Sequence, residues 1–105
     1  METITYKNLP VNPNPHNVDV RILFQDDKIQ ILHITLNPGE SLPKHTMNLN
    51  ALFYILDGSG IASIGNEVQE VSRDTLIPSP AELERGWRNN SDKPLRILVT
   101  KILNL

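Results

Sequence analysis

The sequence predicts an all-β protein, a small sandwich or barrel of packed antiparallel sheets. Isoleucine, valine and threonine occur 11, 6 and 6 times, whereas alanine occurs three times. β-Branched residues favour strands and alanine favours helices. Turn signals also recur about every eight to twelve residues, a spacing typical of β-sandwiches and barrels. At 105 residues, the chain is one domain.

The first two predicted strands cover residues 18–24 and 29–36. Four apolar side chains of the first strand alternate along it and fall on one face: Val18, Val20, Ile22 and Phe24. The second strand has apolar residues on both faces, so we expect both faces to be covered. Paired aspartates form the turn between the two strands, and a Pro-Gly step ends the second.

Shorter strands follow along the rest of the chain. We expect them at residues 52–56, 61–64, 68–71, 75–77 and 95–103. Gly65 and Asn66 form the turn between the second and third of these strands. An Asp-Lys-Pro step leads into the last and longest strand.

Two segments are expected to lack strand structure. Residues 12–17 contain two Asn-Pro steps and should form an extended loop that leaves His16 in solvent. Residues 79–85 should form one short helical turn. There Ser79 is a capping residue, Pro80 suits the first helical position, and a glutamate follows three residues after the cap.

Charge and composition exclude several classes of function. The net charge is −2, so we expect neither a nucleic-acid partner nor a membrane partner. The chain has no cysteine, which excludes disulfides, thiolate catalysis and Cys-ligated metals. Its three histidines are His16, His33 and His45. The sequence shows neither a secretory signal nor a run of about 18 apolar residues, so we expect a cytoplasmic protein.

Two clusters of residues between positions 38 and 90 follow a known pattern. Gly39 is followed by five residues and then by His45, and a strand-like apolar run ends at Gly58. Pro78 and Asn89 stand at the ends of a second cluster, which closes with Gly-Trp-Arg-Asn. In these spacings the segment resembles the two motifs of the cupin family. The resemblance implies a jelly-roll β-barrel of two packed antiparallel sheets, usually dimeric.

The chain departs from the family pattern where cupins bind metal. The family motifs imply three histidines and one glutamate as ligands. His45 stands at the first histidine position, but Met47, Ala51 and Arg85 stand at the second histidine, the glutamate and the third histidine. A thioether is soft and neutral, alanine has no donor atom, and a guanidinium does not deprotonate. We therefore expect no standard metal site and no cofactor.

These replacements lead to the hypothesis of an anion-binding pocket inside the barrel. If Arg85 points inward, its guanidinium can clamp a carboxylate or phosphate bidentately. His45 can hydrogen-bond the same ligand. The expected apolar walls are Met47, Phe53, Ile55 and Trp87. The predicted function is therefore the binding of a small, anionic molecule.

Simpler roles for the same residues remain open. Arg85 can pair with Glu82 or Glu84 outside the barrel. Trp87 can belong to the core or to a dimer interface. Met47 can fill an irregular gap in the core.

Enzymes and a purely structural domain are the alternative functions. An atypical metal-dependent dioxygenase or isomerase would need iron, zinc, manganese or nickel on a rebuilt site, with His45, His33 and either Glu82 or Glu84 as ligands. A metal-independent isomerase or epimerase would use His45 as base and Tyr54 as acid. Strand alternation, however, should point Tyr54 out of the barrel.

The chain is expected to have two parts and to form a homodimer. An extended N-terminal segment covers residues 1–17, and a single β domain covers residues 18–105. A β-sandwich of this size leaves strand edges that a second copy can cover. The N-terminal segment, which carries Ile4 and Tyr6, is a candidate for crossing to that copy.

Overall fold

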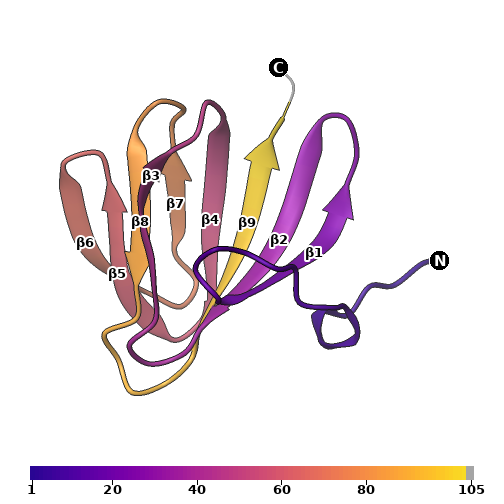
Figure 1. The fold of residues 1–105 in the computed structure, drawn as a ribbon, viewed down its shortest axis with the longest axis horizontal. Helices are drawn as coiled ribbons and strands as arrows, with labels where there is room; N and C mark the ends of the chain where they lie inside the picture. The colour runs from indigo at the N-terminus through magenta and orange to yellow at the C-terminus, as the bar shows by residue number, and fades with distance from the viewer. Residues whose placement is uncertain (104–105) are drawn as a thin grey trace.

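The computed structural model describes residues 1–103, which form nine strands and one 3-10 turn (Figure 1). In chain order the elements are η1 (Tyr6–Asn8), β1 (Asp19–Gln25), β2 (Ile29–Leu36), β3 (Ser41–Thr46), β4 (Asn50–Asp57), β5 (Ser59–Ile64), β6 (Glu67–Ser72), β7 (Leu76–Ser79), β8 (Glu84–Arg88) and β9 (Leu95–Ile102). Within these residues, no helix has the length and apolar character needed to cross a membrane.

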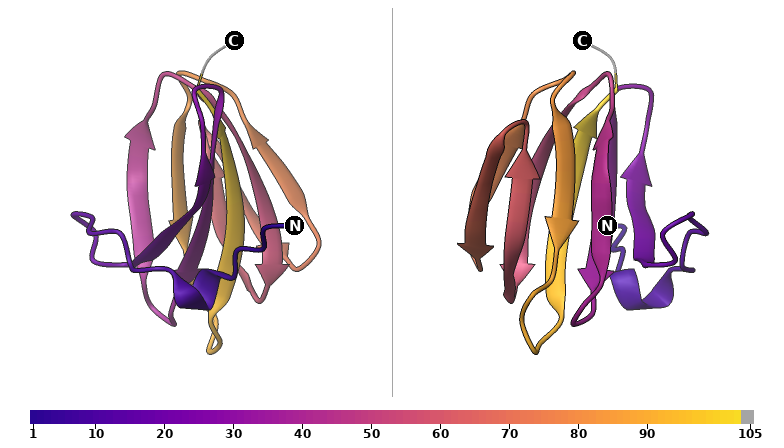
Figure 2. Two further views of the ribbon diagram at one scale, coloured as in Figure 1. Left: turned by 90° about the vertical axis from the view of Figure 1, so that its right-hand side faces the viewer. Right: turned by 60° about the vertical axis from the view of Figure 1, so that its left-hand side comes forward.

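The strands form two antiparallel sheets that face each other as two layers (Figure 2). One sheet has five strands in the order β1-β2-β9-β4-β7, and the other has four in the order β3-β8-β5-β6. Strands that are distant in sequence lie side by side, as in a jelly roll. The prediction of an all-β protein with two packed antiparallel sheets is confirmed.

The core lies between the sheets and follows the alternation of each strand. Ile34, Ile97 and Ile55 stand side by side on β2, β9 and β4, with exposed fractions of 6%, 0% and 0%. On β4 the buried Phe53 alternates with Tyr54, which faces the outside. Burying one large apolar side chain stabilises a fold by about 1.5–3 kcal/mol. This layer of side chains therefore holds the two sheets together.

Strand β2 is covered on both faces, as its sequence predicts. His33 faces outward yet is buried, because Tyr6 stacks on its ring with 3.8 Å between the centroids. Arg21 Nη1 donates to the backbone oxygens of Tyr6, Lys7 and Leu9, which holds η1 against β1. The N-terminal segment thus contains one 3-10 turn and packs on its own sheet. Its crossing to a second copy stays a prediction.

Phe24 does not lie on the face predicted for it. The pairing of β1 with β2 shifts between Ile22 and Phe24. Ile22 stands opposite Leu32 on the inner face, whereas Phe24 stands opposite Ile31 on the outer face. A β-bulge adds one residue to a strand and so reverses the faces beyond it.

The helical turn predicted at residues 79–85 is wrong. Ser79 belongs to β7, and its buried hydroxyl has no hydrogen-bond partner among the described residues, so it caps no helix. Glu82 has a φ of 74°, in the left-handed region that a right-handed helix excludes. The amide of Ala81 instead donates to the side-chain oxygen of Asn50 at 2.7 Å. The segment is a turn between two strands.

Strand β3 is an element that the apolar pattern did not predict. It pairs with β8, and the pairing shifts between Leu42 and His45. The two backbones come close at Gly86, where an added Cβ would lie 3.1 Å from the carbonyl oxygen of Leu42. The missing side chain at Gly86 therefore lets β3 approach, and the register then places His45 directly opposite Arg85.

Candidate functional site

A cavity of about 230 Å³ opens between the sheets and the loop that precedes β1. Functional pockets for drug-sized molecules measure about 300–1,000 Å³, so this space suits a small ligand. The polar side chains that line it are Asn12, Asn14, His16, Gln30, His45, Arg85 and Lys101. None of the lining residues within the described part of the chain is aspartate or glutamate.

Arg85 lines this cavity from β8 and is 2% exposed. Its Nη2 donates to the carbonyl oxygens of Leu49 at 2.8 Å and Pro80 at 3.3 Å. Its Nε and Nη1 are buried and have no hydrogen-bond partner among residues 1–103. Burial lowers the pKa of this guanidinium, because the charged form loses contact with water. The inward position answers the question left open by the sequence. Arg85 forms no ion pair with Glu82 or Glu84.

Lys101 lines the cavity from β9, in the opposite sheet. Burial, and secondly the charge of Arg85, lower the pKa of its ammonium group. Both effects raise the cost of keeping two positive charges in one partly dry space.

Two histidines stand in more exposed positions around the same space. The rings of His16 and His45 are 6.5 Å apart between centroids. His45 Nδ1 lies 3.1 Å from the carbonyl oxygen of Pro43, which can only accept. Nδ1 therefore donates to Pro43, and Nε2 is left for a ligand. We call the space lined by His16, His45, Arg85 and Lys101 the cationic cavity.

Apolar side chains complete the walls of the cationic cavity. Phe53 and Trp87 pack with 5.2 Å between ring centroids, and Met47 also lines the space. The buried indole Nε1 of Trp87 has no hydrogen-bond partner among the described residues, which adds a third unused donor. The structure thus brings together five of the six residues expected from the sequence. The sixth, Ile55, packs in the core and does not line the cavity.

Sequence reasoning missed two of the residues that line the cationic cavity. His16 is exposed, as expected, but it also lines the cavity, where the side chain of Asn14 bonds to the backbone of residues 12, 16 and 18 and fixes the loop that carries it. Lys101 continues the inward alternation of Ile97 and Val99 along β9. That period of two was a signal that could have found it.

The residues at the expected metal position do not fit a metal ion. His45 offers one ring nitrogen there, but Ala51 has no donor and the buried Arg85 repels a cation. His33 lies on the outer face of β2, where its Nε2 accepts a hydrogen bond from Arg96. Among residues 1–103, no three histidine or acidic side chains gather closely enough to hold a metal. The structure does not assemble the rebuilt site considered from the sequence.

Tyr54 does not join His45 either. Its hydroxyl donates to the carboxylate of Asp74 at 3.2 Å on the outside of the barrel. The outward orientation expected from strand alternation is therefore confirmed.

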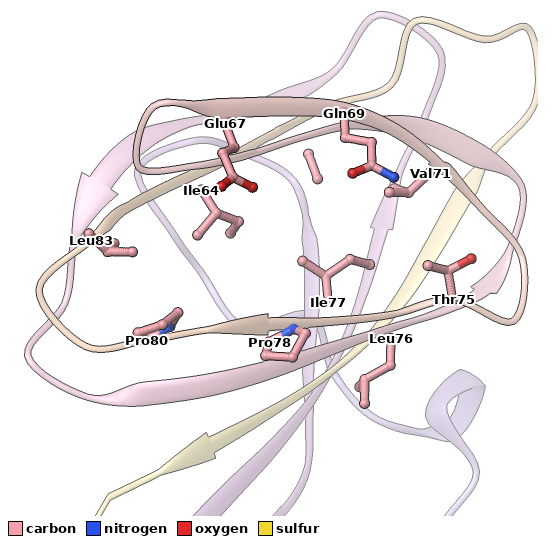
Figure 3. A pocket seen from close by; sticks show the side chains of 11 residues that line it. Ile64, Glu67, Gln69, Val71, Thr75, Leu76, Ile77, Pro78, Pro80 and Leu83 are labelled. Atoms are coloured by element: carbon pink, nitrogen blue, oxygen red, sulfur yellow. The ribbon is translucent and has the colours of Figure 1, made fainter.

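A second, larger cavity lies between the edge strands β6 and β7 (Figure 3). Its volume is about 400 Å³, and we call it the edge cleft. Ile77 points from β7 into this cleft, and Glu67 and Gln69 reach it from the other side (Figure 3). No lysine, arginine or histidine is among its described lining residues.

Sequence comparison places this chain beside a known family. The family model of the cupin domain matches residues 32–101. The chain is also 31% identical over 58 residues to a 5-nitrosalicylic acid 1,2-dioxygenase from Bradyrhizobium sp. That match covers 55% of this chain and 28% of the relative, so the chain spans less than a third of the relative's length.

Solved structures with the same architecture include two with TM-scores near 0.9. A predicted oxalate decarboxylase from Thermotoga maritima has a TM-score of 0.88 at 16% identity, covering 98% of this chain and 100% of that chain. The polyketide cyclase RemF from Streptomyces resistomycificus has a TM-score of 0.87 at 18% identity, covering 99% of this chain and 80% of that chain. At these identities the likeness shows a shared fold.

Proposed function

Because this chain belongs to the cupin family, whose model matches residues 32–101, we propose that its barrel interior binds a small organic anion with Arg85 as the main anchor. The observation that carries the proposal is the buried guanidinium of Arg85, which among residues 1–103 has two donors without a partner and forms no ion pair with a carboxylate. Burying an unpaired charge is costly unless something compensates for it. A bound carboxylate would supply that compensation.

The surroundings of Arg85 support a carboxylate attached to an apolar body. Nε and Nη1 of Arg85 can each donate to a carboxylate oxygen, and such charge-assisted hydrogen bonds are the stronger ones. Phe53 and Trp87 offer apolar surface to the rest of the molecule. The related dioxygenase, whose name includes 5-nitrosalicylic acid, is consistent with this ligand class.

A metal ion has no part in the anion binding that we propose. Arg85 and Lys101 supply positive charge in the cationic cavity, where cupins often hold a metal. The donor set described above, with one histidine beside a methionine, an alanine and an arginine, supports the same view.

Calorimetric titration with matched acids and amides tests the proposal. We expect butyrate and benzoate to bind the native protein, and butyramide and benzamide to bind about 10- to 100-fold more weakly. Arg85→Met should weaken the binding of butyrate and benzoate by a similar factor. Arg88→Met is the matched control, because Arg88 is exposed on the same strand. Equal binding of acids and amides, or full binding by Arg85→Met, would contradict the proposal.

An acid–base enzyme is the second candidate function. The observation that favours it is the presence of two histidines, His16 and His45, in one cavity with Arg85. One histidine can take a proton from the carbon next to a bound carboxylate while the other returns one. In deuterium oxide, the NMR signal of that C–H group in butyrate should then disappear with the native protein and persist with His45→Gln. Persistence of the signal with the native protein would remove this candidate.

A further inference from the structure

The cationic cavity holds more positive charge than one carboxylate can balance. Arg85 and Lys101 reach it from opposite sheets, and no described lining residue is acidic. Charges interact strongly where water is scarce, and a single carboxylate offsets one of the two. This inference rests on the proposed function and adds the number of acidic groups in the ligand.

A second place for an acidic group lies beside the first. His45 stands opposite Arg85 on adjacent antiparallel strands, where Cβ atoms are about 4.5–5.5 Å apart. The ring of His16 is 6.5 Å from that of His45. Unlike the buried Arg85, both histidines are exposed, so the pair stands nearer to solvent.

The loop that carries His16 is built to hold it there. Asn14 donates to the backbone oxygens of Asn12 and Val18 and accepts from the amides of His16 and Val18. The amide of Asn12 also bonds to the backbone oxygen of Val20 in β1. These bonds fix the backbone of the loop at His16, so the loop itself loses little freedom when a ligand binds, which favours binding.

We infer that the ligand of the cationic cavity is a small organic diacid. One acidic group is bound by Arg85 and Lys101, and the other by His16 and His45. The apolar segment that joins the two groups lies against Phe53 and Trp87. A diacid supplies two negative charges to the two cations, Arg85 and Lys101. Because Nδ1 of His45 bonds to Pro43, Nε2 donates to the second acidic group when the ring carries two protons, as an imidazolium.

Titration with matched monoacids and diacids at one pH tests this inference. The probes are butyrate against glutarate and benzoate against isophthalate. We expect each diacid to bind the native protein at least about tenfold more tightly than its monoacid. In the double variant H16A/H45A each diacid should bind about as tightly as its monoacid, while binding of the monoacids persists. Lys44→Ala is the matched control, because Lys44 is the exposed neighbour of His45 on β3 and does not line the cavity.

The outcomes separate this inference from the proposed function. If monoacids and diacids bind equally and Arg85→Met abolishes both, the diacid inference is wrong and the anion-binding proposal stands. If the diacid preference survives in H16A/H45A, the histidine pair does not bind the second group and the inference is again wrong. Absence of binding by all four probes at about 10 mM, where even a Kd above 1 mM is detectable, would overturn both proposals.

Discussion

The cationic cavity and the edge cleft both lie between the two sheets, yet they differ in whether their walls contain buried polar groups without hydrogen-bond partners. The cleft is larger, about 400 Å³ against about 230 Å³. Glu67, its acidic residue, is exposed and can keep its hydration. The smaller cavity contains buried donors on Arg85 and Trp87 that have no partner among the described residues.

The difference shows that volume alone is a poor guide to a binding site. Two sheets that twist apart leave space at their edges whatever the sequence, and the edge strands β6 and β7 bound such a space (Figure 3). A buried arginine that has no counterion within residues 1–103 is different, because it costs stability in the empty protein. A function that uses the charge explains why such a residue is kept.

The largest expected difference between the two regions is the loss of stability when one wall residue of each is truncated to alanine. Phe53 is 4% exposed and packs on Trp87, so Phe53→Ala should lower the free energy of unfolding by about 3–5 kcal/mol. Leu76, which lines the edge cleft, is 53% exposed, so Leu76→Ala should cost less than about 1 kcal/mol. Urea titration measures both values. A cost for Leu76→Ala close to that of Phe53→Ala would mean that the cleft is a closed part of the core.

His33, which lines neither region, should control part of the pH dependence of stability. Burial, and secondly the charge of Arg96, lower its pKa from 6.5 to about 4. Between these values the unfolded chain binds a proton that the folded chain does not. The free energy of unfolding should therefore fall as pH drops from 6.5 towards 4, by at most about 1.4 kcal/mol per pH unit.

Comparison with a His33→Gln variant isolates this contribution, because all other titrating groups are shared. Urea titrations at several pH values between 4 and 7 should give a smaller slope for the variant. Equal slopes for the two proteins would show that His33 keeps its proton equilibrium on unfolding.

Arg85→Met should have the smallest effect on stability, in spite of its large expected effect on binding. Replacing a buried charged group by an apolar side chain of similar size is often neutral or stabilising. The variant also loses the two hydrogen bonds to Leu49 and Pro80, which offsets part of this gain, so we expect the free energy of unfolding to change by less than about 1 kcal/mol. Thermal denaturation without added acids measures it, with Arg88→Met as control. A loss above about 2 kcal/mol would make Arg85 a structural residue and remove the contrast between the two regions.

Most of the fold could be predicted from the sequence, because short apolar runs separated by turns have few other solutions. The strands that failed were those without such runs. β3 carries proline, lysine and histidine, and its place depends on pairing with β8 at Gly86. The turn before β8 has the residue types of a helix start, but a contact with Asn50 decided its conformation.

The candidate site was predictable as a set of residues but not as a charge distribution. The spacing of the family motifs identified His45 and Arg85 as candidate site residues, and the strand register places them opposite each other. Lys101 and His16 come from segments about 85 residues apart in sequence, and only the tertiary structure brings them to one cavity. The homodimer expected from the sequence stays a prediction, which sedimentation equilibrium can measure.

The two carbonyl contacts of Arg85 give the empty site a mechanical role. The guanidinium of Arg85, on β8, donates to Leu49 just before β4 and to Pro80 in the turn after β7, so it connects the two layers. The amide of Glu82 adds a second link nearby, because it donates to the backbone oxygen of Met47 and so joins the turn before β8 to the loop before β4. A ligand that binds the guanidinium of Arg85 would strengthen or weaken both sets of hydrogen bonds. The rate at which the amides of Ala81 and Glu82 exchange with solvent would then signal occupancy from outside the cavity.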